Sequence, residues 1–515
     1  MGNGILKFKN FIKILIFIPV IFYYGPRSYI GLDEGFYALQ ARWILEKGNW
    51  TIPLWFDNYV LDRTIGLQFL IAKSQEIFGE NLFAAYLPTT ISAIIMLFVT
   101  YKLHEEFFDK KYAIISPLIL STTYLWFDYS HLATQDIIYS SLVTIGLFAL
   151  VKVKNNKSNF YILLFGIWIG LAFMIKTFLV AVPLAAFLPY LKTKHKLLFT
   201  NFFWIGLLIG FSPYLLWTYH VNNYLDQNII FFLFGKFNIL ANKNNFTNPF
   251  YYYFWNIPIT FLPWSIFAIF GLFVNTFYIK KETLVLTYFP LIVIAILSIF
   301  STKTPYYPLQ ISAILSLNTF IGIKHLFSSK KIKYFVVFTT SKIIPTLIFL
   351  IVFTYLIFFQ KSVDFNLKEN ILVILGLILF ALSWSCIKNK SNIQEVFTAL
   401  IIGPYLLTSL LLQSGLFTDR SKDLRETMEY LSSLDIFQNQ SIKVDQSSIN
   451  SNTQSKIIKI SLLTPNLGDG IKDLKELKSS DIVWSTYSIK EKDKSYQLVL
   501  DDENLSPWKL IKKNQ

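Results

Sequence analysis

Charged residues, cysteine and nucleotide-binding motifs are all scarce or missing in this sequence. Charged side chains make up 15% of its 515 residues and hydrophobic ones 54%, whereas an average soluble domain has roughly 25% charged residues. The single cysteine, Cys386, excludes an intramolecular disulfide. No glycine-rich phosphate-binding motif is present. The composition therefore excludes a soluble enzyme of several compact domains, and nothing points to a nucleotide cofactor.

Positive charge is in excess, but its distribution does not fit nucleic-acid binding. The formal net charge is +15, from 47 basic and 32 acidic residues. A nucleic-acid-binding protein concentrates Lys and Arg on one solvated face, whereas most lysines here lie in short segments between apolar runs. We therefore expect a lipid bilayer, and no nucleic acid, among the partners.

Long apolar runs are abundant. A helix needs about 17–25 apolar residues to cross a ~30 Å hydrocarbon layer, and only helices or closed barrels satisfy the backbone there. Thirteen runs predict transmembrane helices, at 9–24, 82–103, 112–127, 132–151, 159–175, 177–191, 199–218, 256–278, 283–300, 305–326, 343–359, 369–387 and 396–414. The sequence thus predicts a mainly α-helical, polytopic integral membrane protein.

The placement of lysines predicts which loops face the cytoplasm. If the start of the chain is cytoplasmic, the alternate loops and segment ends contain 21 lysines against five acidic residues, as the positive-inside rule requires. Thirteen crossings then place the N-terminus in the cytoplasm and the C-terminus outside. We therefore expect a multi-pass protein of the plasma (inner) membrane with a periplasmic or extracytoplasmic C-terminal part.

Three predicted outer segments, 25–81, 219–255 and 415–515, are too long to be simple connections. We assign 1–414 to a transmembrane domain and 415–515 to a small soluble α/β domain, because from Leu416 onward 15 basic residues balance 15 acidic ones. Residue patterns in this last segment predict strands at 457–463, 481–487 and 496–500, and helices at 422–434 and 470–477.

The first outer segment contains two predicted short helices. One begins at Asp33 and Glu34 and closes at Gly48. It is amphipathic and too short to span, so we expect it to lie along the membrane surface. The other covers 62–79 and opens with Asp62 and Arg63.

Arginine is confined to this same segment. Before the tail the chain has three arginines, Arg27, Arg42 and Arg63, and all three lie within 25–81. The planar guanidinium matches phosphate and carboxylate, whereas Lys acts as a point charge. The cluster predicts a site for an anionic lipid head group. The alternative is snorkelling and ordinary surface pairing.

Two carboxylates are candidates for catalysis. Asp33 is either a catalytic residue or the N-cap of the helix that follows it, and the two roles are compatible if backbone donors hold the side chain. Asp136 lies at the outer end of the fourth predicted span, where ionisable residues are costly and usually functional. The alternative for Asp136 is a structural role as the partner of a nearby Lys.

Cations near the outer ends of later spans complete the set. Lys236 and Lys303 either reach a phosphate in a shared cavity or anchor their helices at the interface. His131 alone is weak support for a metal. Cations stabilise a leaving phosphate, and a carboxylate orients or deprotonates an attacking hydroxyl. The set therefore suits group transfer from a phosphate-linked lipid to a hydroxyl.

Several stretches occur in a characteristic order. They are Asp33-Glu34 to Trp50–Pro53, Phe78–Asn81 with Leu87-Pro88, Asp136, Asn248–Tyr252 to Leu262–Trp264, and Lys303–Pro308. This series resembles the GT-C glycosyltransferases, specifically the superfamily of protein O-mannosyltransferases and bacterial aminoarabinose–lipid A transferases, which are called ArnT. The resemblance covers roughly residues 1–330.

The resemblance implies a GT-C fold with about 13 transmembrane helices and an outer C-terminal domain. It implies inverting transfer of a sugar from a polyprenyl (undecaprenyl) phosphate to a hydroxyl or phosphate of an envelope lipid, glycan or protein. Asp33 becomes the main catalytic carboxylate, with Glu34 beside it and Asp136 as a second acid. Arg63 of the Asp62-Arg63 pair meets the carrier phosphate. The remaining candidates are Arg42, Lys303 and Lys236 for the phosphate, and Asp62, Tyr37, His131 and Tyr306 for the substrate cavity.

Two departures from the family pattern limit what the resemblance implies. The family usually has Lys followed by two prolines where this chain has Arg63 followed by Thr64 and Ile65, and Phe36 stands where lipid A enzymes tend to carry Arg. The particular sugar and acceptor are therefore not carried over.

Two other functions fit a polytopic chain. One is a transporter or flippase of lipid-linked saccharides, although the internally repeated halves typical of transporters are not apparent. The other is a membrane scaffold that displays its tail. A divalent metal between Asp33 and Asp136 is compatible with the sequence, but no ligand spacing demands it, and no other cofactor is expected.

Overall fold

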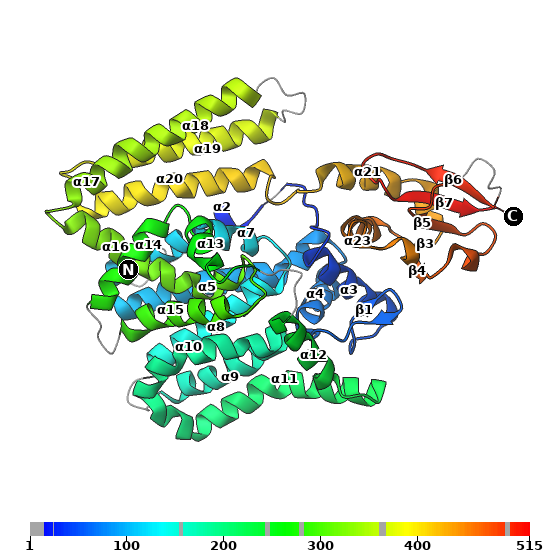
Figure 1. Ribbon diagram of the computed structural model, residues 1–515, viewed down its shortest axis with the longest axis horizontal. Helices are drawn as coiled ribbons and strands as arrows, with labels where there is room; N and C mark the ends of the chain where they lie inside the picture. Colours follow the sequence, from blue (N-terminus) through cyan, green and yellow to red (C-terminus); the bar gives the residue numbers. More distant parts are fainter. Residues whose placement is uncertain are drawn as a thin grey trace, which may run out of the picture. The chain divides into compact units, whose positions relative to one another are not determined.

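The chain folds into two compact units. The computed structural model (Figure 1) describes residues 15–23, 25–153, 158–242, 248–277, 283–359, 367–489 and 495–514. Unit 1 contains residues 1–25, 62–64 and 89–417, and unit 2 contains residues 26–61, 65–88 and 418–515. Most of the first predicted outer segment therefore folds with the tail, although more than 300 residues separate them along the chain.

Unit 1 is helical, and its helix α5 begins within unit 2. The described helices are α2 (Ile18–Ile21), α5 (Leu82–Phe107), α6 (Ile115–Ser121), α7 (Tyr124–Ser130), α8 (Gln135–Lys152), α9 (Asn159–Lys176), α10 (Ala181–Leu191), α11 (Asn201–Leu225), α12 (Ile229–Asn242), α13 (Tyr252–Thr260), α14 (Ser265–Phe277), α15 (Leu284–Ile299), α16 (Ser312–Ser328), α17 (Lys333–Phe338), α18 (Ile344–Phe359), α19 (Leu367–Ser385) and α20 (Ile393–Ser414).

The number of membrane-spanning helices differs from the predicted thirteen, which is not confirmed. By length and composition, seven described helices can cross a membrane, or eight if α13 and α14, bent by 118°, count as one. The apolar runs do coincide with helices, but several helices are broken or short. Run 112–127, for example, is divided between α6 and α7 because Thr123 caps α7. Residues 9–14 and 24 of run 9–24 lie outside the described residues, and α2 lies in the remainder.

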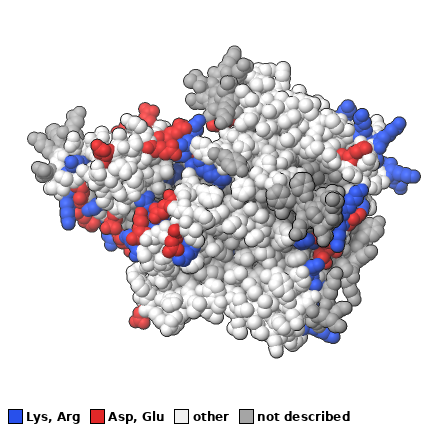
Figure 2. Space-filling model, turned by 180° about the vertical axis from the view of Figure 1, so that it is seen from behind, with Lys and Arg blue, Asp and Glu red and all other residues white. Residues whose placement is uncertain are grey.

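The surface of unit 1 is that of a multi-pass membrane protein. Large apolar side chains remain exposed, including Leu208 (66%) and Leu216 (61%) on α11 and Phe353 (62%) on α18. Extended apolar surface of this kind is rare on soluble monomers. Figure 2 shows that most of the surface over these helices is uncharged, with Lys and Arg gathered along one edge.

Helices α9 and α11 approach each other through glycines. Gly166 and Gly170 on α9 face Gly206 and Gly210 on α11, so each helix presents two small residues four positions apart. A Cβ on Gly170 would lie 2.1 Å from the carbonyl carbon of Gly210, and one on Gly206 would lie 2.2 Å from the Leu163 oxygen. The absence of side chains therefore permits the backbones to touch.

Replacing Gly170 by alanine is expected to destabilise this helix pair by about 2 kcal/mol, because the backbone of α11 must move to admit the methyl group. The measurement is the melting temperature of the purified protein in detergent. Gly235→Ala on α12 is the matched control, since a Cβ there meets nothing within 4 Å. If both variants melted like the wild type, the close approach of α9 and α11 would be wrong.

Unit 2 is built around a small mixed sheet. Its elements are α3 (Glu34–Lys47), β1 (Leu54–Trp55), β2 (Asn58–Tyr59), α4 (Gly66–Phe78), α21 (Lys422–Ser432), α22 (Asp435–Asn439), β3 (Ile442–Asp445), α23 (Gln454–Leu463), β4 (Leu467–Ile471), β5 (Ile482–Ser485), β6 (Tyr496–Leu500) and β7 (Lys509–Lys513). The sheet order is β4-β3-β5-β7-β6, with β3 parallel to β4 and β5, and β7 antiparallel to β5 and β6. This confirms a small α/β fold in the tail.

The tail pattern was only partly predictable. The predicted strands at 481–487 and 496–500 and the helix at 422–434 correspond to β5, β6 and α21. The predicted strand at 457–463 is wrong, because these residues belong to helix α23. The predicted helix at 470–477 is also wrong: β4 ends at Ile471, and only a 3-10 turn, Leu474–Glu476, follows.

The first outer segment and the tail share one hydrophobic core. Leu39 and Trp43 of α3 and Phe56 pack in a single buried cluster with tail residues that include Trp484 and Trp508. The apolar stripe of α3 is therefore covered by protein. The stripe is therefore not available to anchor α3, and the position of α3 along the membrane surface stays a prediction. The helix itself ends as predicted, with Gly48 at φ 65°.

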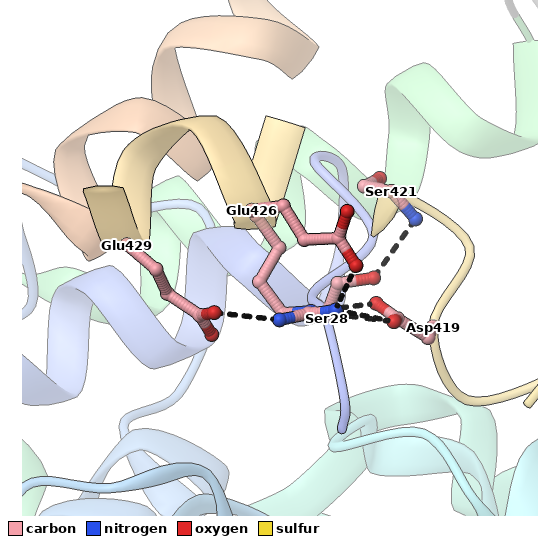
Figure 3. Close-up of polar contacts among 6 residues, drawn as sticks. Ser28, Asp419, Ser421, Glu426 and Glu429 are labelled. Carbon is pink, nitrogen blue, oxygen red and sulfur yellow. Dashed lines mark hydrogen bonds and ion pairs between the residues drawn. The ribbon is translucent and has the colours of Figure 1, made fainter. Parts of the chain in front are cut away.

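Polar contacts reinforce the same unit (Figure 3). The backbone N–H of Ser421 donates to Ser28 Oγ at 2.8 Å, and the Ser28 N–H donates to the Thr418 carbonyl at 3.0 Å. Arg425 makes ion pairs at 2.7–3.1 Å with Asp419, Glu426 and Glu429, the three acids labelled in Figure 3. The start of the tail is thus held to residues just before α3.

Candidate active site

A buried ion pair lies at the junction of α8 and α9 in unit 1. Asp136 is in the first turn of α8, Lys176 is the last residue of α9, and Lys176 Nζ donates to the Asp136 carboxylate. Their side chains are only 10% and 12% exposed. Removing one partner of such a pair leaves an uncompensated buried charge, which typically costs about 3–5 kcal/mol. The pair is therefore a buried polar contact between α8 and α9.

Three tyrosine rings surround the Lys176 ammonium. Nζ lies 4.9 Å from the ring centre of Tyr306, 5.6 Å from that of Tyr307 and 5.9 Å from that of Tyr139. These distances are within the ~6 Å range of cation–π attraction. The Tyr139 hydroxyl donates to the Leu179 carbonyl at 3.0 Å, which fixes one wall. A cation thus lies beside a carboxylate, with three aromatic rings around it. Aromatic faces of this kind also suit the C–H face of a sugar ring.

Lys303 is buried in the loop that precedes Tyr306. It is 4% exposed, and Nζ donates to the carbonyls of Phe300 at 2.6 Å and Asn248 at 2.9 Å. Asn248 Nδ2 returns a bond to the Lys303 carbonyl at 3.0 Å. Burial lowers the pKa of Lys303 below its usual value. Lys303 therefore hydrogen-bonds its own loop to the segment that contains Asn248. A contact between Lys303 and phosphate stays a prediction.

Asp62 and Arg63 form a pair with each other. Arg63 Nε donates to Asp62 Oδ1 at 2.9 Å, and Nη2 donates to Oδ2 at 3.2 Å. The helix predicted at 62–79 begins at Gly66, so the pair lies in the connection that precedes it. Both side chains are partly exposed, by 42% for Asp62 and 22% for Arg63.

Asp33 makes no capping bond, whereas its neighbour Glu34 accepts a hydrogen bond from the backbone. Asp33 occupies the N-cap position of α3, but its side chain makes no capping bond. Glu34 is 1% exposed, and its Oε2 accepts from the Ile30 N–H at 2.8 Å. Burial, and secondarily the Glu34 charge, raises the pKa of Tyr29 well above its usual value. The expectation that backbone donors hold Asp33 as a cap is therefore wrong, and Glu34 is the acid held that way.

The backbone of Asp33 is strained. Its φ of 50° and ψ of −81° lie outside the regions that L-residues normally adopt. Such strain typically costs about 1–3 kcal/mol and concentrates at functional sites. The outlier supports a functional hypothesis for Asp33 independently of capping.

Arg42 connects α3 to α23. Its Nη1 donates to the carbonyls of Ser461 at 3.1 Å and Thr464 at 2.8 Å, and Nη2 donates to that of Pro465 at 2.6 Å. These acceptors lie at the C-terminal end of α23, where helices leave carbonyls unsatisfied and favour cations. The side chain is buried, with Nε on Glu46 at 2.5 Å. These contacts give a structural explanation of Arg42 and no support for phosphate binding.

The three arginines belong to different settings. Arg27 lies 4.8 Å above the ring of Tyr86 in unit 2, and Arg42 is also in unit 2, whereas Arg63 belongs to unit 1. The predicted arginine cluster therefore stays a prediction.

The remaining candidate residues are His131, Tyr37 and Lys236. His131 Nδ1 lies 2.7 Å from the Phe127 carbonyl at the end of α7, and the residue is 3% exposed. Tyr37 is buried in α3. Lys236 belongs to α12, and its side chain lies outside the described residues. Within the described part of the chain, no three His, Cys, Asp or Glu side chains are grouped as a metal site requires, and a cation between Asp33 and Asp136 stays a prediction.

Lys176 is the residue that the motifs did not single out. It is 40 positions from Asp136, and the ion pair depends on where α8 and α9 meet. A signal was present, because Lys176 interrupts two adjacent apolar runs and the predicted topology places it on the same side as Asp136.

Known proteins share both sequence and fold with this chain. Residues 62–217 match the family model described as Dolichyl-phosphate-mannose-protein mannosyltransferase. An undecaprenyl phosphate-alpha-4-amino-4-deoxy-L-arabinose arabinosyl transferase of Wigglesworthia glossinidia brevipalpis is 29% identical over 286 residues, 52% of this chain and 50% of that protein. Its namesake in Enterobacter sp. (strain 638) is 28% identical over 204 residues, 37% and 36% of the two chains. The matched region spans about a third to a half of these relatives.

The structural likeness extends over the whole chain. ArnT from Cupriavidus metallidurans, crystallised with undecaprenyl phosphate, matches with a TM-score of 0.77 at 13% identity, covering 100% of this chain and 99% of the other. The apo crystal structure of the same protein gives 0.76 at 14% identity, covering 100% and 98%. The family match, the relatives and the shared fold confirm the predicted resemblance: the chain is similar in sequence to the arabinosyl transferases and shares the fold of ArnT.

Proposed function

We propose that this protein is a membrane glycosyltransferase that moves a sugar from a polyprenyl phosphate to an acceptor on the outer face of the plasma membrane. The observation that carries the proposal is the whole-length likeness in fold to a protein crystallised with undecaprenyl phosphate. The names of the relatives, which refer to an undecaprenyl-phosphate-linked sugar, support the same donor class.

The proposed reaction is a single displacement. An acceptor oxygen attacks the anomeric carbon of the donor sugar, the bond from that carbon to the phosphate oxygen breaks, and polyprenyl phosphate leaves with the electron pair. The acceptor proton passes to a carboxylate. Because the acceptor attacks opposite to the leaving group, the anomeric configuration inverts. The protein must therefore stabilise negative charge on the phosphate and accept a proton.

Three cations of unit 1 are proposed to stabilise the negative charge on the phosphate. Lys176 is buried and paired with Asp136, and the tyrosine rings around it suit the donor sugar. Arg63, in its partly exposed pair with Asp62, and the buried Lys303 are the other proposed phosphate contacts. Their donors act most strongly where water is excluded.

The proton acceptor is proposed from the resemblance and from the backbone. Asp33 is our assignment for the main catalytic carboxylate, supported by its strained φ and ψ. Glu34, which is buried and held by the Ile30 N–H, is proposed to orient the start of α3. The acceptor is a hydroxyl or phosphate of an envelope lipid, glycan or protein.

The roles of Asp33 and Arg63 are tested by transfer assays in nanodiscs with polyprenyl-phosphate sugars and an envelope extract. Asp33→Asn and Arg63→Ala are each expected to lower the transfer rate about 10²-fold, because one removes the proton acceptor and the other a donor to the leaving group. The matched controls are Glu76→Gln and Lys73→Ala, which remove charges from an exposed ion pair on α4. Full activity in both test variants would refute the site assignment. Lipid translocation without sugar release would favour a flippase instead.

A further inference from the structure

A cavity of about 690 Å³ lies at the turn between α19 and α20 in unit 1. Its walls come from the end of α19 with Cys386, from the turn with Lys388, Ser391 and Asn392, and from the first turns of α20 with Thr398. This place is distant in sequence from every candidate for sugar transfer. The turn is also predicted to face the cytoplasm, whereas the transfer site is predicted on the outer side.

The mouth of the cavity is basic. Lys388 lines it, Lys390 lies in the same turn and is exposed, and Lys333 of α17 donates to the Ser391 carbonyl at 3.3 Å. Among the described residues that line the cavity, Glu395 is the one acid. Its Oε1 accepts from Asn392 Nδ2 at 2.7 Å, and its Oε2 accepts from the Asn392 N–H at 3.1 Å. The Glu395 carboxylate is thus hydrogen-bonded within the cap of α20. Together with Lys388 and Lys390 it leaves a net positive charge around the cavity.

The cavity changes from polar to apolar along the helices. Lys388, Ser391 and Asn392 lie at the turn, whereas Ile402, more than two turns into α20, closes the other end. Ile402 is 45% exposed, and Leu382 on α19 is 49% exposed, so apolar surface continues beyond the cavity. A small soluble anion would gain nothing from contact with this apolar surface. A lipid needs both parts, since its phosphate meets the lysine and its acyl chains meet the apolar side chains.

We propose that this cavity binds the head group of an anionic phospholipid of the surrounding leaflet. Lys388 pairs with the lipid phosphate, the Ser391 hydroxyl and the second hydrogen of Asn392 Nδ2 donate to its oxygens, and an acyl chain follows the exposed surface near Ile402. The site is separate from the proposed sugar transfer, so either claim stands if the other fails.

Cys386 supplies a direct probe of occupancy, because it lines the cavity and is the only cysteine among the 515 residues. The experiment measures how fast a neutral maleimide alkylates the full-length protein in nanodiscs. These consist of phosphatidylcholine alone or of phosphatidylcholine with about a third phosphatidylglycerol. A bound head group is expected to slow alkylation of Cys386 about fivefold, the factor that corresponds to one basic contact with an anionic surface.

Two variants separate a bound lipid from a general effect of surface charge. Cys386→Ser/Asn389→Cys moves the thiol to an exposed position in the same turn that does not line the cavity, and its alkylation should change less than about twofold. Lys388→Gln should abolish the protection of Cys386, and Lys388→Arg should retain it.

The proposal is overturned by any of three results. Alkylation of Cys386 is equal in the two lipid mixtures, or the thiol at position 389 is slowed as much as Cys386, or Lys388→Gln keeps full protection. A further arm adds inorganic phosphate or glycerol phosphate to phosphatidylcholine nanodiscs. Equal protection there would mean a site for soluble anions and would also refute a lipid site.

Discussion

The double variant Asp136→Asn/Lys176→Met is expected to fold normally and to lose sugar transfer by about 10²-fold, the typical effect of removing a preorganised group that stabilises a leaving anion. A buried ion pair replaced by a neutral pair of similar volume is often neutral or stabilising. The melting temperature of the double variant should therefore stay close to that of the wild type, while the transfer rate at saturating donor falls.

The single variants show whether the pair has more than a structural role. Lys176→Met alone leaves the Asp136 carboxylate buried without its ion-pair partner, so it should also lower the melting temperature. Since that loss of stability confounds the activity of the single variant, the double variant is decisive. If it transferred sugar at the wild-type rate, Asp136 and Lys176 would be a structural pair and no part of the reaction.

Arg42→Ala is expected to destabilise unit 2 by about 3 kcal/mol, because it strips buried carbonyls at the end of α23 of a charged donor. Lys in its place keeps the charge but not the planar fork, so Arg42→Lys should lie between the wild type and Ala. The measurement is hydrogen exchange in peptides from α3 and α23, which should become faster together because the two helices share one core.

Lys47 provides the matched control for Arg42. It connects α3 to the tail through Asp469 at 3.3 Å, and to the turn between β1 and β2 through Asp57 at 2.7 Å. Burial lowers the pKa of Lys47, but the bonds to these carboxylates raise it by more. Because the pair with Asp57 is largely exposed, Lys47→Ala should cost less than about 1 kcal/mol. Equal exchange rates in Arg42→Ala and the wild type would contradict the structural assignment of Arg42.

That the chain is a multi-pass membrane protein was readable from the sequence because apolar length depends on local composition alone. The orientation inferred from the lysines stays a prediction. The number of spans was not readable, since breaks such as the one at Thr123 lie inside runs that remain apolar throughout. Helix α3 was also predictable, from its charged start to the glycine at its end. Its burial was not, because the partners that cover Leu39 and Trp43 lie some 380 residues or more further along the chain.

The error at α23 has a specific physical cause. Ile457, Ile458 and Ile460 are β-branched residues next to polar ones, which favours a strand by local preference. In the structure these three residues and Ser461 are buried on one helix face, because positions i, i+1, i+3 and i+4 coincide on a helix. Packing against the core therefore overrode the local preference.

The candidate site was predicted residue by residue but not as a set of contacts. Asp136 was weighed as either a functional acid or the partner of a lysine, and the structure supplies that lysine, Lys176, together with the tyrosines around it. Arg42 had the right residue type for phosphate and yet binds backbone carbonyls. Residue type alone cannot distinguish an anion site from a helix end, because both present oxygen acceptors to the same guanidinium.

The central claim is that a polyprenyl phosphate delivers the sugar. The most direct measurement incubates the purified protein with a polyprenyl-phosphate sugar and an envelope extract, and quantifies free polyprenyl phosphate and newly glycosylated acceptor by mass spectrometry. The account predicts that both appear in equal amounts and that the Asp136→Asn/Lys176→Met protein produces neither above background. Carrier that is never released from its sugar, across the range of donors offered, would contradict it.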